Sequence, residues 1–232
     1  MPILSAPLFQ QPPNSYSCGI YSVKMILNYL GVDKSAQELE SEIELFNGGT
    51  FAPQLCLYLM KLGLKTKIIT KNPFLFTAKD RTLSTPELLK RLDYVSTKIK
   101  EDDKDNKIAI RFFREYLEAE GQICIEIPHF DHLKTAIEEN HLLIANLSGG
   151  YIYKDLPSWS FHYVVVNGFD LSSYGKQGSE SHEVCYLDPY PNSPSPFPDK
   201  ISRLAADEFL YAVNSVCHGC VDCGCLIEIS KK

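Results

Sequence analysis

Gln11-Pro12-Pro13-Asn14-Ser15-Tyr16-Ser17-Cys18-Gly19 leads directly into the apolar run 20–30, and this stretch decides the fold. Apolar residues recur along 20–30 at helical spacing, which predicts a helix buried on most sides. The two prolines hold the lead-in extended, and Ser15 or Ser17 is placed to cap the helix. Gly31 is placed to end it. We therefore expect Cys18 in the first turn of a core helix.

The position of Cys18 at the start of a helix favours a reactive thiolate. The first turn of a helix has unpaired backbone N–H groups and a positive dipole end, which favour a thiolate over a thiol. Gly19 puts no side chain beside the sulfur, and Gln11 offers a neutral amide donor upstream. A low-pKa thiolate beside such a donor is half of an acyl-transfer site. The competing interpretation is a small hydrophobic cysteine in a core helix, and this stretch alone does not decide between them.

Length and composition limit the class of protein. The chain has 232 residues, of which 44% are hydrophobic and 22% charged, as in an ordinary globular domain with a sizeable core. The net charge of −6 gives no reason to expect nucleic acid or an anionic membrane as a partner.

The start of the chain has no basic segment followed by a long apolar run, so we expect no signal peptide. No apolar run approaches the roughly 20 residues of a membrane span. These features predict a cytoplasmic protein without a membrane partner and leave signal-independent secretion open.

The order of the expected elements indicates the fold class. Helices are expected first, and strands gather in the second half, chiefly at 122–127, 142–147, 161–170, 183–188 and 225–230. A further helix is expected over 202–213, and a short early strand over 65–70. This order predicts an α+β fold in which a helical N-terminal portion packs on an antiparallel sheet from the C-terminal half. We expect one domain over 1–232, with a helical insertion around 73–121.

A thiolate nucleophile needs a base, usually histidine, and that histidine needs an orienting partner. Among the 6 histidines, only His162 begins a strongly strand-like segment, where a stiff scaffold would hold it. If 161–170 and 183–188 pair as a hairpin about Gly175, His162 faces Asp188. Directly opposed residues have Cβ atoms roughly 4.5–5.5 Å apart, within reach of a hydrogen bond. The alternative is a buried His–Asp pair that only fastens the hairpin.

These motifs carry a resemblance to a known family. Gln11, Ser17-Cys18-Gly19, the run from His162 to Asp170 and Asp188-Pro189 are similar to the motifs of the C39-like cysteine peptidases, a papain-like group. The resemblance implies a papain-like fold with Cys18 as nucleophile, His162 as base, Asp188 as orienting acid and Gln11 as oxyanion donor. Gln10 is a close competitor of Gln11 for the last role.

The sequence departs from the family pattern in places. The family usually continues Cys-Gly-Pro-Ala, whereas this chain has Ile20 and Tyr21 after Gly19. The segment from Pro73 to about Gly121 is longer and more helical than in a minimal member.

The third departure is a cluster of cysteines near the end of the chain. Two overlapping Cys-x-x-Cys pairs within nine residues make Cys217, Cys220, Cys223 and Cys225 weak candidates for a structural zinc site. Zinc sites usually pair two knuckles separated by a dozen or more residues, so a redox pair or reduced thiols are favoured. We expect no metal and no cofactor.

The resulting prediction is a cysteine peptidase or amide hydrolase that acts on a peptide or protein substrate through an acyl-enzyme. Two alternatives stay open on the same fold. One is a thiol acyltransferase that passes the acyl group to an amine, and the other is a peptide-binding module without activity.

Overall fold

The computed structural model describes residues 3–46, 49–153, 161–171, 182–191, 200–216 and 223–231. Its helices are α1 (Cys18–Tyr29), α2 (Ala36–Glu42), α3 (Ala52–Lys61), the 3-10 helix η1 (Ala78–Thr82), α4 (Thr85–Ser96), α5 (Lys104–Glu118), α6 (Phe130–Glu138), α7 (Gly149–Ile152) and α8 (Ala206–Ser215). Its strands are β1 (Leu64–Thr70), β2 (Gln122–Ile125), β3 (Leu142–Ser148), β4 (Phe161–Leu171), β5 (His182–Leu187), β6 (Ser202–Ala205) and β7 (Cys225–Lys231).

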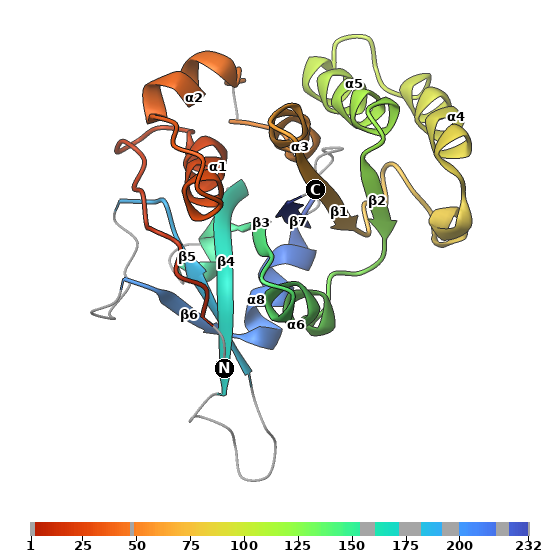
Figure 1. Cartoon of the computed structure of the whole chain (residues 1–232). Helices are drawn as coiled ribbons and strands as arrows, with labels where there is room; N and C mark the ends of the chain where they lie inside the picture. Colours follow the sequence, from red (N-terminus) through yellow and green to blue (C-terminus); the bar gives the residue numbers. More distant parts are fainter. Residues whose placement is uncertain are drawn as a thin grey trace.

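The strands form one 7-stranded sheet in the order β2-β1-β7-β3-β4-β5-β6. Only β1 and β2 pair parallel in this sheet, and the other neighbours are antiparallel. In Figure 1, α1 lies beside β4, whereas α4 and α5 lie at the β2 end. Helix α1 and the helical middle section therefore occupy different parts of the sheet.

Helices cover the two faces of the sheet, as the side chains of β1 show. The Thr66 hydroxyl contacts Tyr116 of α5 at 3.2 Å, whereas Lys67 points to Glu228, which contacts His141 just after α6. Successive strand residues point to opposite faces, so α5 and α6 lie on opposite sides. Helices α1 and α3 lie in the same layer as α5. In the other layer, Asn214 of α8 donates a hydrogen bond to Pro128 O just before α6 and so connects α8 with α6.

A β-bulge divides β4 into two halves. Gly168 pairs with Cys185, but Val166 pairs with Tyr186, so Asn167 is the extra residue. Such an insertion reverses the alternation of side chains between faces. Tyr163 accordingly lies beside Gly19 of α1, whereas Phe169 packs on Phe130 of α6 at 5.5 Å. One strand thus serves both helical layers.

The bulge also anchors the N-terminal segment. Leu4 N–H donates to Asn167 O at 2.7 Å, and Asn167 Nδ2 donates to Leu4 O at 3.1 Å. At the other end of the segment, Gln11 N–H donates to Pro189 O at 2.7 Å. These bonds guide the lead-in along β4 and β5 to the start of α1.

The predicted α+β class is confirmed, with two corrections. Residues 202–205 form the edge strand β6, and the helix expected from Ser202 begins at Ala206. The sheet also recruits β1 from the first half of the chain, and its parallel pairing with β2 replaces the purely antiparallel sheet that we expected. Pairing between strands distant in sequence overrode the local helical pattern in the first case.

Residues 73–121 contain η1, α4 and α5, and none of their described residues lies in a strand. Across the described ranges, no helix combines the length and apolarity that crossing a membrane requires.

Gly19 is required by the packing of α1. A Cβ built at Gly19 would lie 2.1 Å from Thr50 Oγ1, 3.1 Å from Leu55 Cδ1 and 3.3 Å from Tyr163 Cδ2. Thr50 is buried, with 8% of its surface exposed, so its side chain has little room to withdraw. The glycine therefore lets α1 pack closely against the segment before α3.

We predict that Gly19→Ala lowers the free energy of unfolding by about 1–3 kcal/mol, the usual range for overpacking. Thr50→Ala removes the nearest colliding atom, so the double variant should recover much of that loss. Urea denaturation of the wild type, both single variants and the double variant measures the coupling. An equal effect of Gly19→Ala in the Thr50 and Ala backgrounds would contradict this account.

Candidate active site

Cys18 is the first residue of α1 and is half-buried. Ser17 is the N-cap residue but makes no side-chain capping bond, and Ser15 Oγ donates to Pro12 O at 2.8 Å. The expected serine cap is therefore wrong, because Ser15 closes the preceding turn instead. Neither serine side chain caps the first turn of α1, so the backbone N–H groups of that turn remain available to the Cys18 sulfur.

The surroundings of Cys18 favour the thiolate. Burial alone would raise the pKa of the Cys18 thiol, but a hydrogen bond and the charge of His162 outweigh burial and lower this pKa below its ordinary value. Backbone N–H groups of Tyr163 and Gly19 also donate to the sulfur and lower the pKa further. These contacts favour a Cys18 thiolate paired with the His162 ring.

His162 lies near the start of β4 and is buried, with 7% of its surface exposed. Its Nε2 lies 2.8 Å from Asp188 Oδ1, which leaves Nδ1 to face Cys18. Burial opposes the imidazolium, but hydrogen bonds to Asp188 and Cys18 raise the pKa of His162 to about 10. The ring is thus held charged between a thiolate and a carboxylate.

Asp188 follows β5 directly and is also buried. Its Oδ1 accepts the Tyr190 N–H at 2.8 Å in addition to the His162 ring. Its Oδ2 accepts the hydroxyl of Tyr153 at 3.0 Å. Tyr153 was not among the predicted site residues, because only the fold brings the end of α7 back to the end of β5.

The contact between His162 and Asp188 is not made by the register that we expected. The register of the hairpin places Val165 opposite Leu187, so the ladder continued by one residue would put Asp188 opposite Val164. Asp170 pairs with Glu183, three residues away from the pairing that a hairpin about Gly175 would give, and the extra residue Asn167 reduces this shift to two at Val165 and Leu187. Gly175 itself lies outside the described residues. His162 and Asp188 are diagonal neighbours, and the length of the imidazole side chain bridges the gap.

Gln11 is buried, with 5% of its surface exposed, whereas Gln10 is exposed. Gln11 Nε2 donates to Ser15 O at 2.7 Å and lies 3.2 Å from Ser15 Oγ. Gln11 Oε1 is buried without a hydrogen-bond partner. The bond to Pro189 places the buried Gln11 beside the residue that follows Asp188.

The predicted cysteine cluster is only partly visible. Cys217 and Cys220 lie outside the described residues, and Cys223 and Cys225 are buried, with 4% and 2% of their surfaces exposed. Both flank the start of β7, and Asn146 Nδ2 of β3 lies 3.5 Å from Cys223 O. The described part of the cluster is thus built into the sheet.

Two other groups of side chains bring possible metal ligands together. Possible ligand atoms of Cys124, Glu126 and His132 lie within 4.8 Å of one another. However, His132 Nδ1 accepts the His129 N–H at 3.2 Å, and burial lowers the pKa of His132. A neutral ring with an accepting Nδ1 carries its proton on Nε2, which faces Glu126 at 3.3 Å and is not available to a metal.

The second group consists of Glu139, His141 and Glu228. His141 Nδ1 lies 2.8 Å from one oxygen of Glu228, and Lys67 Nζ lies 3.0 Å from the other. Both oxygens of the Glu228 carboxylate therefore already have close partners. Neither group is arranged to hold a metal ion.

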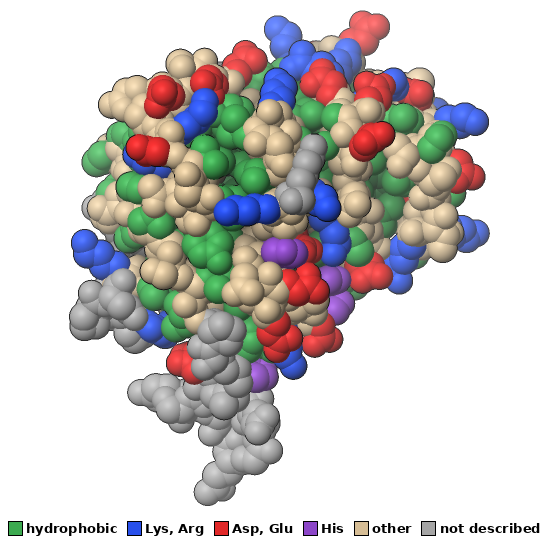
Figure 2. Space-filling model, in the orientation of Figure 1, with side chains coloured by type: hydrophobic (Ala, Val, Ile, Leu, Met, Phe, Trp, Pro, Cys, Tyr) green, Lys and Arg blue, Asp and Glu red, His purple; other side chains and the backbone are tan. Residues whose placement is uncertain are grey.

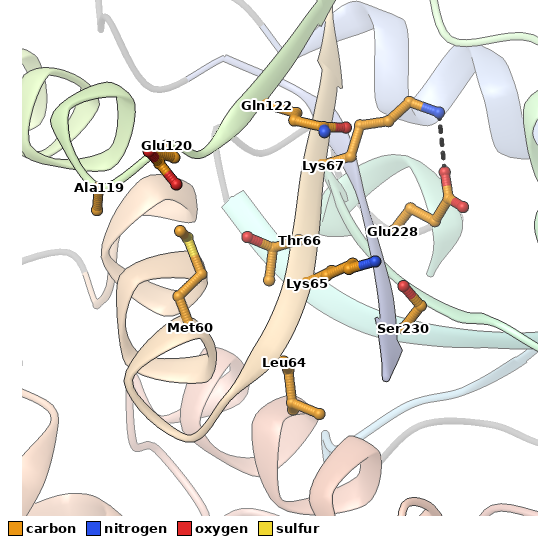
Figure 3. Close-up of a pocket in the computed structure, with 10 residues that line it drawn as sticks. All are labelled: Met60, Leu64, Lys65, Thr66, Lys67, Ala119, Glu120, Gln122, Glu228 and Ser230. Carbon is orange, nitrogen blue, oxygen red and sulfur yellow. Dashed lines mark hydrogen bonds and ion pairs between the residues drawn. The ribbon is translucent and has the colours of Figure 1, made fainter. Parts of the chain in front are cut away.

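Figure 3 shows a pocket beside β1 and β7, where Lys67 pairs with Glu228 near Lys65 and Ser230. Its volume is about 390 Å³. Its lining contains none of the predicted site residues. Over the face shown in Figure 2, acidic and basic side chains are interspersed among the described residues. Neither feature competes with the Cys18 region as a site for chemistry.

Comparison with known proteins adds to this geometry. Residues 7–110 match the Peptidase C39 family. The predicted resemblance is confirmed over these residues, and the match supports a cysteine peptidase. It includes Gln11 and Cys18 and ends before His162 and Asp188, so the second half of the site rests on the structure alone.

The chain is also similar to two solved structures. One is a double glycine motif protease from an AMS/PCAT transporter in complex with the leader peptide, with 13% identity over 99% of this chain and 95% of that chain and a TM-score of 0.48. The other is the peptidase domain of Streptococcus ComA, a bifunctional ABC transporter of a quorum-sensing pathway, with 15% identity over 98% and 100% and a TM-score of 0.46. No curated protein matches the chain.

The ion pair predicts selective alkylation of Cys18. Cys124 is a matched control because it is also half-buried, while burial and Glu126 raise the pKa of its thiol. Each unit of pKa difference changes the thiolate fraction about tenfold, so at pH 6–7 iodoacetamide should modify Cys18 at least about tenfold faster than Cys124. Mass mapping of labelled peptides over time measures both rates.

His162→Ala should slow the labelling of Cys18 at this pH and leave Cys124 unchanged. Equal labelling of the two cysteines in the wild-type protein would rule out a stabilised Cys18 thiolate.

Proposed function

We propose that the protein is a cysteine peptidase or amide hydrolase in which Cys18, His162 and Asp188 form the catalytic triad. The observation that carries this proposal is the position of His162. Its Nε2 bonds Asp188 Oδ1 at 2.8 Å, and the ring also hydrogen-bonds the Cys18 sulfur. A buried structural His–Asp pair would need no thiolate on its other side, so the three-residue chain favours nucleophilic chemistry.

In the proposed reaction, the Cys18 thiolate attacks the carbonyl carbon of a peptide or amide bond. A C–S bond forms, and the carbonyl π electrons move to oxygen. The tetrahedral intermediate collapses as the C–N bond breaks, and the His162 imidazolium transfers its proton to the leaving nitrogen. The products of this step are an amine and an acyl-enzyme thioester.

Deacylation reverses the proton flow. Neutral His162 takes a proton from a water molecule, and the oxygen of that water attacks the thioester carbon. The C–S bond then breaks, so that a carboxylic acid leaves and the thiolate–imidazolium pair is restored. Asp188 keeps the ring oriented in both steps and stabilises its charged form.

We assign Gln11 as an oxyanion donor together with the backbone N–H at the start of α1. Gln11 Nε2 contacts both Ser15 O and Ser15 Oγ, so the amide must exchange a Ser15 contact for the substrate oxygen. Donors that tighten only in the reacting complex are common in catalytic sites. Gln11 Oε1 is buried without a hydrogen-bond partner, so the hydrogen bonds of this side chain are not all satisfied. This supports a change of its contacts when substrate binds.

We propose a peptide or protein segment as substrate, with no metal or cofactor. The double glycine protease noted above was solved with a leader peptide. A cytoplasmic location would keep the Cys18 thiolate reduced. We also propose one domain over 1–232, with residues 73–121 as a helical insertion.

Product analysis tests the function directly. The full chain is incubated with a mixed peptide library, and mass spectrometry identifies new termini. We expect cleavage by the wild type and none by Cys18→Ala, with the acyl-enzyme trapped as a mass increase on Cys18. Cleavage that survives Cys18→Ala would refute the proposal. Products joined to an added amine, in place of free acids, would identify an acyltransferase.

Gln11→Ala should lower turnover by about 10²–10³-fold, as removal of an oxyanion donor does in other enzymes. Hydrolysis of a p-nitrophenyl ester measures this without knowledge of the natural substrate. Gln10→Ala is the matched control and should stay within about twofold, because an exposed glutamine cannot reach a buried oxyanion. A reversed result would mean that Gln10 is the donor.

A further inference from the structure

The second oxygen of the Asp188 carboxylate has a partner of its own. Oδ1 serves the His162 ring and the Tyr190 N–H, both at 2.8 Å, whereas Oδ2 accepts the Tyr153 hydroxyl at 3.0 Å. Asp188 is 3% exposed, so these protein donors replace water around the charge. The Tyr153 hydroxyl therefore contacts the carboxylate oxygen that His162 does not use.

Tyr153 is placed by backbone geometry that is unrelated to the catalytic motifs. It is the C-cap residue of the short helix α7, which follows β3 directly. Its ring lies 5.8 Å from the His162 ring and 5.4 Å from the Tyr190 ring, measured between centroids. The side chain thus contacts both the acid and the base of the proposed triad.

The direction of the hydrogen bond is fixed by the charge of the acceptor. Burial and the Asp188 carboxylate raise the pKa of Tyr153, so its hydroxyl keeps the proton and donates. A carboxylate terminus rotates easily, because its last torsion is broad and roughly two-fold. A donor on Oδ2 restricts that rotation and keeps Oδ1 directed at His162 Nε2.

We propose that Tyr153 is a positioning residue of the triad, which acts by holding the plane of the Asp188 carboxylate. The assignment rests on the proposed function. Tyr153 transfers no proton, and its effect reaches the reacting atoms only through Asp188 and His162. It follows that the hydroxyl matters only while residue 188 can accept its hydrogen bond.

A double-mutant cycle tests this dependence. Tyr153→Phe, Asp188→Ala and the double variant of the full chain are compared with the wild type in p-nitrophenyl ester hydrolysis. A hydrogen bond to a charged group contributes 1.5–3 kcal/mol, so Tyr153→Phe should lower kcat by about 10–100-fold, with KM within about twofold. In the Asp188→Ala background, the same change should alter kcat by less than about twofold.

Tyr151→Phe is the matched control. Tyr151 lies on the same helix but packs against Tyr211 at 4.9 Å, so its hydroxyl should not affect kcat. If Asp188→Ala does not fold by circular dichroism, Asp188→Asn replaces it. The asparagine keeps an acceptor oxygen but not the charge, and a neutral hydrogen bond is about half as strong as a charged one, so Tyr153→Phe should then lower kcat by less than it does in the wild type.

Several results would overturn the assignment. Unchanged kcat in Tyr153→Phe would do so, as would an equal loss in the wild-type and Asp188→Ala backgrounds, which would indicate packing independent of the acid. Cys18→Ala separates this test from the function itself. If ester hydrolysis persists in Cys18→Ala, the proposed function fails, whereas loss in Cys18→Ala with no effect of Tyr153→Phe refutes only the role of Tyr153.

Discussion

A line of three ionised groups inside the protein is the constraint on which the site depends. Cys18, His162 and Asp188 alternate in charge as thiolate, imidazolium and carboxylate, and His162 and Asp188 are almost fully buried. Removal of each ion from water costs several kcal/mol even after relaxation, so attraction alone does not secure such an arrangement. The remaining lone pairs must meet fixed donors, and the surrounding fold supplies them.

Those donors come from several segments of the chain that lie beside β4 and β5. The first turn of α1 and the backbone of β4 provide N–H groups to the sulfur. The residue after Pro189 and the residue that ends α7 provide donors to the carboxylate. The N-terminal segment is tied to the same place by the bond from Gln11 to Pro189. The first and second halves of the chain are thus held together where the charges are.

Local sequence was sufficient for the chemistry of individual residues and insufficient for their mutual placement. Periodicity and turn residues predict that Cys18 starts a helix and that His162 lies at the start of a strand. Tyr153 carries no such signal, because its role arises from the return of distant segments. The expected hairpin register failed because the residue pattern of β4 and β5 does not by itself fix which residues oppose each other, and Asp170 pairs with Glu183 before the bulge is reached. Residues 202–205 were expected to be helical, but pairing at the edge of the sheet decides the structure of β6.

The bulge at Asn167 has a consequence for comparing and redesigning this chain. Strand β4 behaves as two strands of opposite parity joined end to end, so Tyr163 and Phe169 face different layers although both are odd-numbered. An alignment that keeps the length of β4 but moves the extra residue would assign buried residues to the wrong helical layer. Because both faces of the strand are buried, hydrophobicity alone would not reveal the error. Substitutions in this strand therefore have to be matched by layer and by half, and not by simple alternation.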